Sequence, residues 1–343
     1  MSRSILIIYT GGTIGMKTDP ETGILSPFQF DQIEKEVPEL KKFNYNLHTV
    51  TFNPPIDSSN ATPEMWKLIA HVIRENYGAY DGFVVLHGTD TMSYSASALS
   101  FMTQNLSKPI IFTGSQIPIG VIRTDAKENL ITSIEIAAAQ DDDGQAIVPE
   151  VCIYFQDKLF RANRTRKHSA EQFNAFASDN YPPLAEAGVN IHYYRTRIKR
   201  LPTLPEPFSV STELDTRVWV VRIFPGMSPE LFRAMLSVPG LKAIVLETYG
   251  SGNAPTADWF IDTLEQAIRR DLIVLNVSQC QAGTVEMERY ETGVRLQKIG
   301  VVSGKDMTTE AALTKLMYLL GQKLSLSQIA EQLKRSIRGE ITR

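Results

Sequence analysis

Short, continuously apolar runs recur along the chain and predict the strands of a sheet that is covered on both faces. Most of these runs show no alternation of apolar and polar residues, which is typical of parallel strands buried on both sides. They are also rich in β-branched residues. The seven runs are residues 5–10, 83–88, 110–114, 151–156, 218–224, 243–250 and 272–280.

Helical patterns lie between several of these runs. Thr62-Pro63-Glu64 carries a hydroxyl, a proline and an acid in the order typical of a helix start, and apolar residues then follow on one face. Ser228-Pro229-Glu230 repeats this start. Further helices are predicted at about residues 125–140 and 309–322 and near the C-terminus. Strands that alternate with helices over this length predict an α/β fold with mainly parallel sheets.

One segment breaks this alternation. Residues 195–207 are basic at first and then rich in proline, with neither helical nor strand periodicity, as is typical of a linker or a crossing loop. We therefore predict a larger N-terminal domain at residues 1–192, a linker at 193–216 and a smaller C-terminal domain at 217–343.

Composition supports an ordinary globular protein and excludes several classes. The chain has 343 residues, 43% hydrophobic and 21% charged, and 35 basic against 38 acidic residues give a net charge of −3. This balance gives no reason to expect a nucleic-acid partner. Two cysteines cannot form a disulfide framework. We find neither a secretory signal nor the ~20 apolar residues that a membrane span needs, so we expect a soluble, cytoplasmic protein without a membrane partner.

Three of the predicted strands end in small and polar residues. These ends read Thr10-Gly-Gly-Thr-Ile-Gly15, His87-Gly-Thr-Asp-Thr91 and Thr113-Gly-Ser-Gln116. In open parallel sheets the ligand crevice lies outside the carboxyl ends of the strands. We therefore expect a small polar ligand with a cationic group that pairs with Asp90. The alternative is that these residues only form tight turns and cap helices.

Other chemistries lack their motifs in this sequence. The first glycine-rich turn differs from the dinucleotide fingerprint because its last glycine comes one position too early, and no phosphate-binding loop is present. The five histidines form no zinc-binding pattern, and no nucleophile elbow occurs. We therefore predict no metal site. A hydroxyl nucleophile with a non-histidine base remains, and Lys167 is a candidate base unless its segment is only a solvated basic loop.

Five motifs, taken together, resemble the bacterial-type L-asparaginase family in order and spacing, and its cytoplasmic type I branch most closely. The likeness extends over essentially the whole chain. It implies hydrolysis of L-asparagine to L-aspartate and ammonia without a cofactor, a left-handed crossover in the larger domain and a flavodoxin-like smaller domain. The motifs are Thr10-Gly-Gly-Thr-Ile-Gly15, Asp57-Ser58-Ser59, His87-Gly-Thr-Asp-Thr91, Asn163-Arg-Thr-Arg-Lys167 and Gly250-Ser-Gly-Asn253.

The resemblance also implies roles for the catalytic residues. By matching position, Thr13 is expected to be the nucleophile that forms a β-acyl-enzyme. Thr89, Asp90 and Lys167 are expected to form a second hydrogen-bonded set in which Lys167 is the base. Backbone N–H groups near Thr89 and Ser115 are expected to form the oxyanion hole.

The same resemblance implies substrate contacts and an assembly. Thr89, Ser115 and Asp90 line the expected pocket, with Asp90 on the substrate's α-ammonium group. Asn253 is expected to complete the site of a neighbouring subunit, so the resemblance implies a homo-oligomer, most often a homotetramer built as a dimer of dimers. The α-carboxylate is expected to bind Asp57, Ser58 and Ser59.

Two features depart from the family pattern. The segment 15–27 fits a mobile lid, but Ile24 stands where many relatives have a tyrosine. An effector pocket of some type I enzymes corresponds to Arg166, Glu247 and Cys280, and Glu247 replaces an arginine there. We therefore predict weak or absent activation by asparagine, unless Arg166 takes over the anchoring of the effector.

Two alternatives stay open at the level of sequence. One is an amidohydrolase subunit that prefers glutamine or an amidated tRNA; the near-neutral charge argues against the tRNA version alone. The other is an amino-acid-binding module without turnover, which would need Asp90 and Ser58 but not the set of Thr13, Thr89 and Lys167.

Overall fold

The computed structural model describes residues 2–18, 25–27, 37–201, 206–289 and 291–342. Its contacts divide the chain into two compact units. The first comprises residues 1–178 and 182–212, and the second comprises residues 179–181 and 213–343. Each unit has its own sheet.

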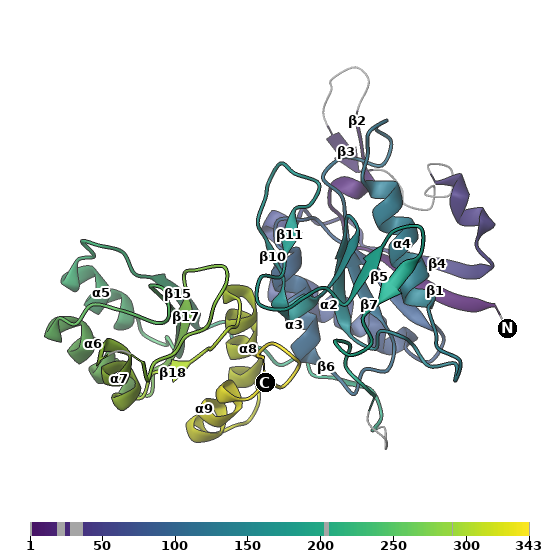
Figure 1. Cartoon of the computed structure of the whole chain (residues 1–343). Coiled ribbons are helices and arrows are strands. Elements are labelled where there is room, and N and C mark those ends of the chain that lie inside the picture. Colours follow the sequence, from purple (N-terminus) through teal and green to yellow (C-terminus); the bar gives the residue numbers. More distant parts are fainter. Residues whose placement is uncertain (1, 19–24, 28–36, 202–205, 290, 343) are drawn as a thin grey trace. The chain divides into compact units, whose positions relative to one another are not determined.

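An eight-stranded sheet forms the centre of the first unit (Figure 1). Its strand order is β13-β12-β9-β8-β7-β5-β1-β4, and the strands from β8 to β4 run parallel. The remaining strands add antiparallel pairs at the β13 end. The bounds are β1 (Arg3–Tyr9), β4 (Tyr45–Thr51), β5 (Gly82–Leu86), β7 (Ile110–Thr113), β8 (Val151–Phe155), β9 (Lys158–Arg161), β12 (Ala185–Ala187) and β13 (Ile191–Tyr193).

Helices and short strand pairs complete the first unit. The α-helices are α2 (Pro63–Asn76), α3 (Met92–Met102) and α4 (Ala126–Ala138). Single turns of 3₁₀ helix are η1 (Thr13–Gly15), η4 (Ser58–Asn60) and η5 (Ala162–Arg164), with a longer one at η3 (Pro38–Lys42). The strand pairs are β2 (Met16–Thr18) with β3 (Leu25–Pro27), β6 (Thr103–Gln104) with β14 (Ser209–Val210), and β10 (Arg166–Lys167) with β11 (Phe176–Ala177).

Burial explains which elements the sequence pattern revealed. Strands β5, β7 and β8 are buried along their whole length, as their continuous apolar runs predict. Strand β4 lies at the edge of the sheet and alternates between half-buried and exposed residues, so it lacks such a run and was not predicted. The serine-rich helix α3 is buried on nearly all sides and therefore shows no amphipathic period; it too was not predicted.

The second unit contains a separate four-stranded parallel sheet. Its strands β15 (Val218–Arg222), β16 (Ala243–Thr248), β17 (Ile273–Ser278) and β18 (Val302–Ser303) lie in chain order. Phe232 and Phe260 stack at 5.0 Å between ring centroids in its core. The helices are α5 (Pro229–Leu236), α6 (Asp258–Ile268), α7 (Glu291–Lys298), α8 (Thr309–Gly321) and α9 (Leu326–Lys334), of which α6 and α7 were not predicted.

A buried ion pair attaches the last residues of this unit to α8. Lys315 Nζ lies 2.6 Å from Glu340 Oε1, and both side chains are fully buried. Lys315 also donates to the carbonyl oxygens of Leu333 and Arg335, at the end of α9. Glu340 accepts hydrogen bonds from backbone N–H groups of residues 337 and 338. The pair therefore holds residues 333–340 against α8.

Among the described residues, no helix combines the length and the apolar character needed to cross a lipid bilayer.

Candidate active site at the carboxyl ends of the first sheet

Two glycine-containing turns meet where β1 and β5 end. Thr10 donates to the carbonyl oxygen of Leu86 through its backbone N–H (3.0 Å) and through its hydroxyl (2.9 Å). Gly12 has a φ of 91°, and a Cβ there would lie 2.5 Å from the Cα of Gly88. Glycine is therefore required at position 12 by both conformation and space. This contact places Thr13, which opens η1, beside the turn that carries Thr89.

Lys167 connects the second turn to β10. Its Nζ donates to Thr89 Oγ1 at 2.9 Å and to Asp90 Oδ1 at 2.7 Å. The Lys167 side chain is 17% exposed, whereas that of Asp90 is 63% exposed. Thr89 is buried. The structure thus brings together three of the predicted site residues and leaves most of the Asp90 side chain open to solvent.

The Asp57-Ser58-Ser59 turn lies against the same loop. Asp57 Oδ1 accepts a hydrogen bond from the backbone N–H of Ser59 at 2.9 Å. Ser58 is buried, and its carbonyl oxygen accepts a hydrogen bond from Thr91 Oγ1 at 2.7 Å. A Cβ on Gly88 would lie 2.4 Å from Ser58 Oγ. Ser58 therefore contacts the Gly88–Thr91 turn directly.

Ser115 follows β7, and its hydroxyl is buried without a hydrogen-bond partner among the described residues. A carboxylate that the sequence did not single out holds this loop. Asp125 accepts hydrogen bonds from the backbone N–H groups of Gln116 (3.0 and 3.1 Å) and Ile117 (3.1 Å). Burial raises the pKa of Asp125, although these hydrogen bonds favour its charged form. Asn129 donates to the carbonyl oxygen of Gly114 at 3.0 Å.

Gln116 is a further site residue that sequence reasoning missed. Its Oε1 accepts a hydrogen bond from Thr89 Oγ1 at 3.4 Å, and its Nε2 donates to the carbonyl oxygen of Gln172 at 3.1 Å. The sequence feature that could have identified Gln116 is its position directly after Ser115, at a strand end.

Tyr9 fills the space beneath η1. Its side chain is fully buried, and a Cβ built on Gly15 would lie 2.1 Å from the Tyr9 hydroxyl oxygen and 2.3 Å from the ring carbon that bears it. The turn that carries Thr13 can therefore adopt this position only with glycine at position 15.

The lid predicted at residues 15–27 is only partly within the described structure. Strands β2 and β3 form its two antiparallel ends. Residues 19–24, including Ile24, lie outside the described residues.

Asn253, Glu247 and Cys280 belong to the second unit, whereas Arg166 lies on β10 of the first. The Asn253 side-chain oxygen accepts a hydrogen bond from Thr292 Oγ1 at 3.2 Å. Glu247 Oε1 accepts a hydrogen bond from Thr309 Oγ1 at 2.5 Å, and its Oε2 lies 4.0 Å from Arg222 Nε. Cys280 is exposed. Glu247 is thus engaged within its own unit.

His87, which precedes the turn that carries Thr89, is fully buried. Its Nδ1 lies 2.7 Å from the carbonyl oxygen of Gly88, and its Nε2 has no hydrogen-bond partner among the described residues. Burial lowers the pKa of His87 from 6.5 to about 4. The neutral ring therefore donates from Nδ1 to the Gly88 carbonyl, which fixes the backbone next to Thr89.

This shift predicts a pH dependence of stability. Between pH 6.5 and 4, unfolding allows His87 to bind a proton that the folded state excludes. The free energy of unfolding should therefore fall as the pH drops through this range, and His87 should account for about 3 kcal/mol of the loss. Above pH 6.5, His87 should not affect the pH dependence of stability. Urea unfolding at several pH values checks this, with His87→Asn expected to show a shallower loss than the wild type. The half-exposed His71 supplies the control variant His71→Asn; equal slopes for all three proteins would contradict the assignment.

Within the described residues, no group of three or more His, Cys, Asp or Glu side chains is arranged to hold a metal ion. The site consists of hydroxyl groups, carboxylates, one lysine and backbone N–H groups. Such a set can activate a hydroxyl nucleophile and bind a zwitterion.

Comparisons with known proteins agree with the geometry. Residues 4–199 match the asparaginase N-terminal family model, and residues 217–333 match the glutaminase/asparaginase C-terminal domain model. The chain is 43% identical to L-asparaginase 1 of Escherichia coli (strain K12), over 99% of this chain and 98% of that one. The crystal structure of L-asparaginase I from Vibrio cholerae superposes with a TM-score of 0.91 at 42% identity, covering all of both chains. The thermostable L-asparaginase from Thermococcus kodakarensis gives a TM-score of 0.89 at 34% identity, with 99% of each chain covered. The chain belongs to the asparaginase family.

Proposed function

We propose that the protein hydrolyses the side-chain amide of L-asparagine to L-aspartate and ammonia through an acyl-enzyme on Thr13. The observation that carries this proposal is the contact of Lys167 Nζ with Thr89 Oγ1 at 2.9 Å and with Asp90 Oδ1 at 2.7 Å, beside the turn of Thr13. The similarity to chains named L-asparaginase supports the choice of substrate.

In the first half of the reaction, the Thr13 hydroxyl oxygen attacks the amide carbon of the substrate. Its proton passes to Lys167, which acts as the base in its neutral form, through Thr89. Backbone N–H groups near Thr89 and Ser115 stabilise the negative charge on the carbonyl oxygen; one such donor contributes about 3 kcal/mol in comparable sites. The amide nitrogen takes up the proton that Lys167 received, the bond between carbon and nitrogen breaks, ammonia leaves, and an ester on Thr13 remains.

In the second half, water replaces the ester. Thr89 and Lys167 orient the water and accept its proton, and attack on the ester carbon releases L-aspartate and restores the Thr13 hydroxyl. Asp90, most of whose side chain is exposed, is suited to bind the α-ammonium group. The turn of Asp57, Ser58 and Ser59 is suited to bind the α-carboxylate, because it carries two hydroxyl groups that can donate hydrogen bonds.

We further propose a cytoplasmic homo-oligomer, built as a dimer of dimers, in which Asn253 completes the site of a neighbouring copy. The domains would divide at residues 192 and 217, with the linker between them. We also propose that asparagine activates the enzyme weakly or not at all through Arg166, Glu247 and Cys280. The engagement of Glu247 with Thr309 supports this, since a paired carboxylate offers nothing to a second carboxylate.

Ammonia release by the wild type over a wide range of L-asparagine concentrations tests both the function and the regulation. We expect turnover with a hyperbolic rate curve, and a lower kcat/KM for L-glutamine, although one methylene contributes only about 1–3 kcal/mol of discrimination. If kcat/KM is higher for L-glutamine than for L-asparagine, L-glutamine is the substrate instead. Binding of L-asparagine without ammonia release would favour the amino-acid-binding module. A sigmoidal curve whose cooperativity disappears in Arg166→Ala or Glu247→Ala would contradict the proposal on activation.

A further inference from the structure

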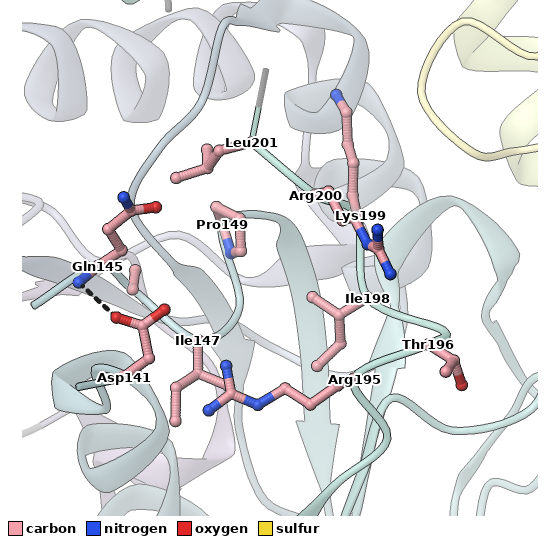
Figure 2. A pocket seen from close by; sticks show the side chains of 11 residues that line it. Asp141, Gln145, Ile147, Pro149, Arg195, Thr196, Ile198, Lys199, Arg200 and Leu201 are labelled. Atoms are coloured by element: carbon pink, nitrogen blue, oxygen red, sulfur yellow. Dashed lines mark hydrogen bonds between the residues drawn. The ribbon is translucent and has the colours of Figure 1, made fainter. Parts of the chain in front are cut away.

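A pocket of about 350 Å³ lies in the first unit, away from the residues discussed so far (Figure 2). It is formed by the segment between α4 and β8 and by the segment that follows β13. Both segments meet the amino end of β8, whereas Thr13, Thr89 and Ser115 follow the carboxyl ends of strands parallel to it. The pocket therefore lies at the opposite edge of the sheet from the candidate active site.

Both walls of the pocket are fixed by hydrogen bonds within the protein. The buried ion pair of Arg161 and Glu150 holds the second segment. Glu150 Oε1 accepts a hydrogen bond from the backbone N–H of Lys199 at 2.5 Å, and Arg161 donates one to the carbonyl oxygen of Arg197 at 3.0 Å. In the first segment, Asp141 Oδ1 accepts from the backbone N–H groups of residues 143 and 145 at 3.1 and 2.9 Å (Figure 2). The pocket is thus preformed, as is typical of small-molecule sites.

The lining combines an apolar surface with an excess of positive charge. Ile147, Pro149 and Ile198 supply apolar contacts, and Pro149 and Ile198 are buried. Three cationic residues, Arg195, Lys199 and Arg200, face one acidic residue, Asp141. The volume lies in the range of small-ligand pockets, and six of the eleven lining residues are polar or charged, which suits a ligand with a charged group.

Arg200 is the cation best placed to bind a ligand. Its guanidinium group makes no hydrogen bond or ion pair within the described part of the chain. By contrast, the neighbouring Arg197 stacks on the Tyr194 ring at 3.9 Å and donates to the carbonyl oxygen of Pro183. In Figure 2, Arg200 lies toward the opposite side of the view from the Asp141 carboxylate, and Arg195 extends toward that carboxylate. Asp141 and Arg195 have opposite charges, so their attraction competes with the binding of an anion at Arg195.

We propose that this pocket binds a small organic anion, a carboxylate or a phosphate monoester with an apolar body. The anionic group binds the guanidinium group of Arg200, which matches the geometry of both oxyanions. The apolar body lies on Ile147, Pro149 and Ile198. Asp141 disfavours a second anionic group at the other end of the ligand. This site is separate from the proposed hydrolysis and does not depend on it.

Isothermal titration calorimetry on the full chain tests the proposal with three probes that share an aromatic body: 3-phenylpropionate, phenyl phosphate and the neutral 3-phenylpropionamide. We expect at least one of the two anions to bind and the amide to bind at least about tenfold more weakly, given the usual strength of charge-assisted hydrogen bonds. Which anion binds more tightly identifies the anionic group. Higher salt should weaken the binding of the anion.

Three variants separate this pocket from other binding sites. Arg200→Gln should raise the Kd of the anion at least about tenfold, and Arg195→Gln should raise it less. Ile147→Gln should raise the Kd of the aromatic anion but leave the Kd of inorganic phosphate unchanged. The control Arg270→Gln removes an exposed arginine on the second unit and should leave Kd unchanged. Circular dichroism verifies that each variant is folded. Absence of binding by the wild type, equal binding of the amide, or an unchanged Kd in Arg200→Gln would overturn the proposal.

Discussion

Replacing Thr13 with valine is expected to lower kcat for L-asparagine hydrolysis by about 10⁴-fold or more, the loss typical when a nucleophile is removed. Valine keeps the shape of threonine but has no hydroxyl oxygen to form the acyl-enzyme. The Kd for L-aspartate, measured by calorimetry, should change little, because the proposed charged contacts of the ligand are made by other residues. Thr13→Ser retains a hydroxyl and should keep a measurable part of the activity.

Thr89→Val serves as the matched variant at the second threonine. If Thr89 only orients and activates, its variant should still form the ester on Thr13 slowly, and mass spectrometry of quenched reactions should find the adduct on the peptide that contains Thr13. An adduct on Thr89 in the Thr13→Val protein would reverse the assignment of the two threonines. Activity of Thr13→Val within tenfold of the wild type would exclude Thr13 as nucleophile.

The largest effect on stability is expected from Glu340→Gln. This change leaves the fully buried ammonium group of Lys315 without its carboxylate, and breaking a buried pair on one side costs about 3–5 kcal/mol in the free energy of unfolding. Burial already lowers the pKa of Lys315, and Glu340 opposes that shift. The double variant Lys315→Met/Glu340→Gln should lose less stability than the sum of its two single variants, because no uncompensated charge remains.

A nearby exposed pair provides the control. Arg335 and Glu331 lie 2.7 Å apart with side chains 66% and 51% exposed, and such surface pairs contribute at most about 1 kcal/mol. Glu331→Gln should therefore change the free energy of unfolding only slightly in urea denaturation followed by circular dichroism. If Glu340→Gln costs no more than Glu331→Gln, the buried pair does not stabilise the attachment of residues 333–340.

The sequence pattern predicted the strands that form continuous apolar runs. Central strands such as β5 and β7 produce continuous apolar runs because both faces are covered. The edge strand β4 has no continuous apolar run, because its residues alternate between half-buried and exposed. Helix α3 shows no amphipathic period, because serines pack inside the unit. Tertiary contacts, which a single sequence does not display, decide both cases.

The residues of the candidate site likewise include some that the sequence could identify and some that it could not. Thr89, Asp90 and Lys167 could be selected from strand ends and motifs, and the structure brings them together. Asp125 could not be selected, because its relevance depends on which backbone N–H groups it reaches after folding. Gln116 was missed although it directly follows Ser115 at a strand end, because its contact with Thr89 forms only on folding.

The contact between Tyr9 and Gly15 has a consequence for how this protein tolerates mutation. Gly15 does not have the left-handed backbone conformation, and the three atoms nearest to a Cβ built there all belong to the Tyr9 side chain. The two positions are therefore coupled, and their substitutions should not be additive. A library that varies position 15 alone would record it as invariant, whereas a library that also allows a smaller residue at position 9 would open sequences that no single-step path reaches. Evolution of this turn is therefore constrained by epistasis between a strand residue and a loop residue.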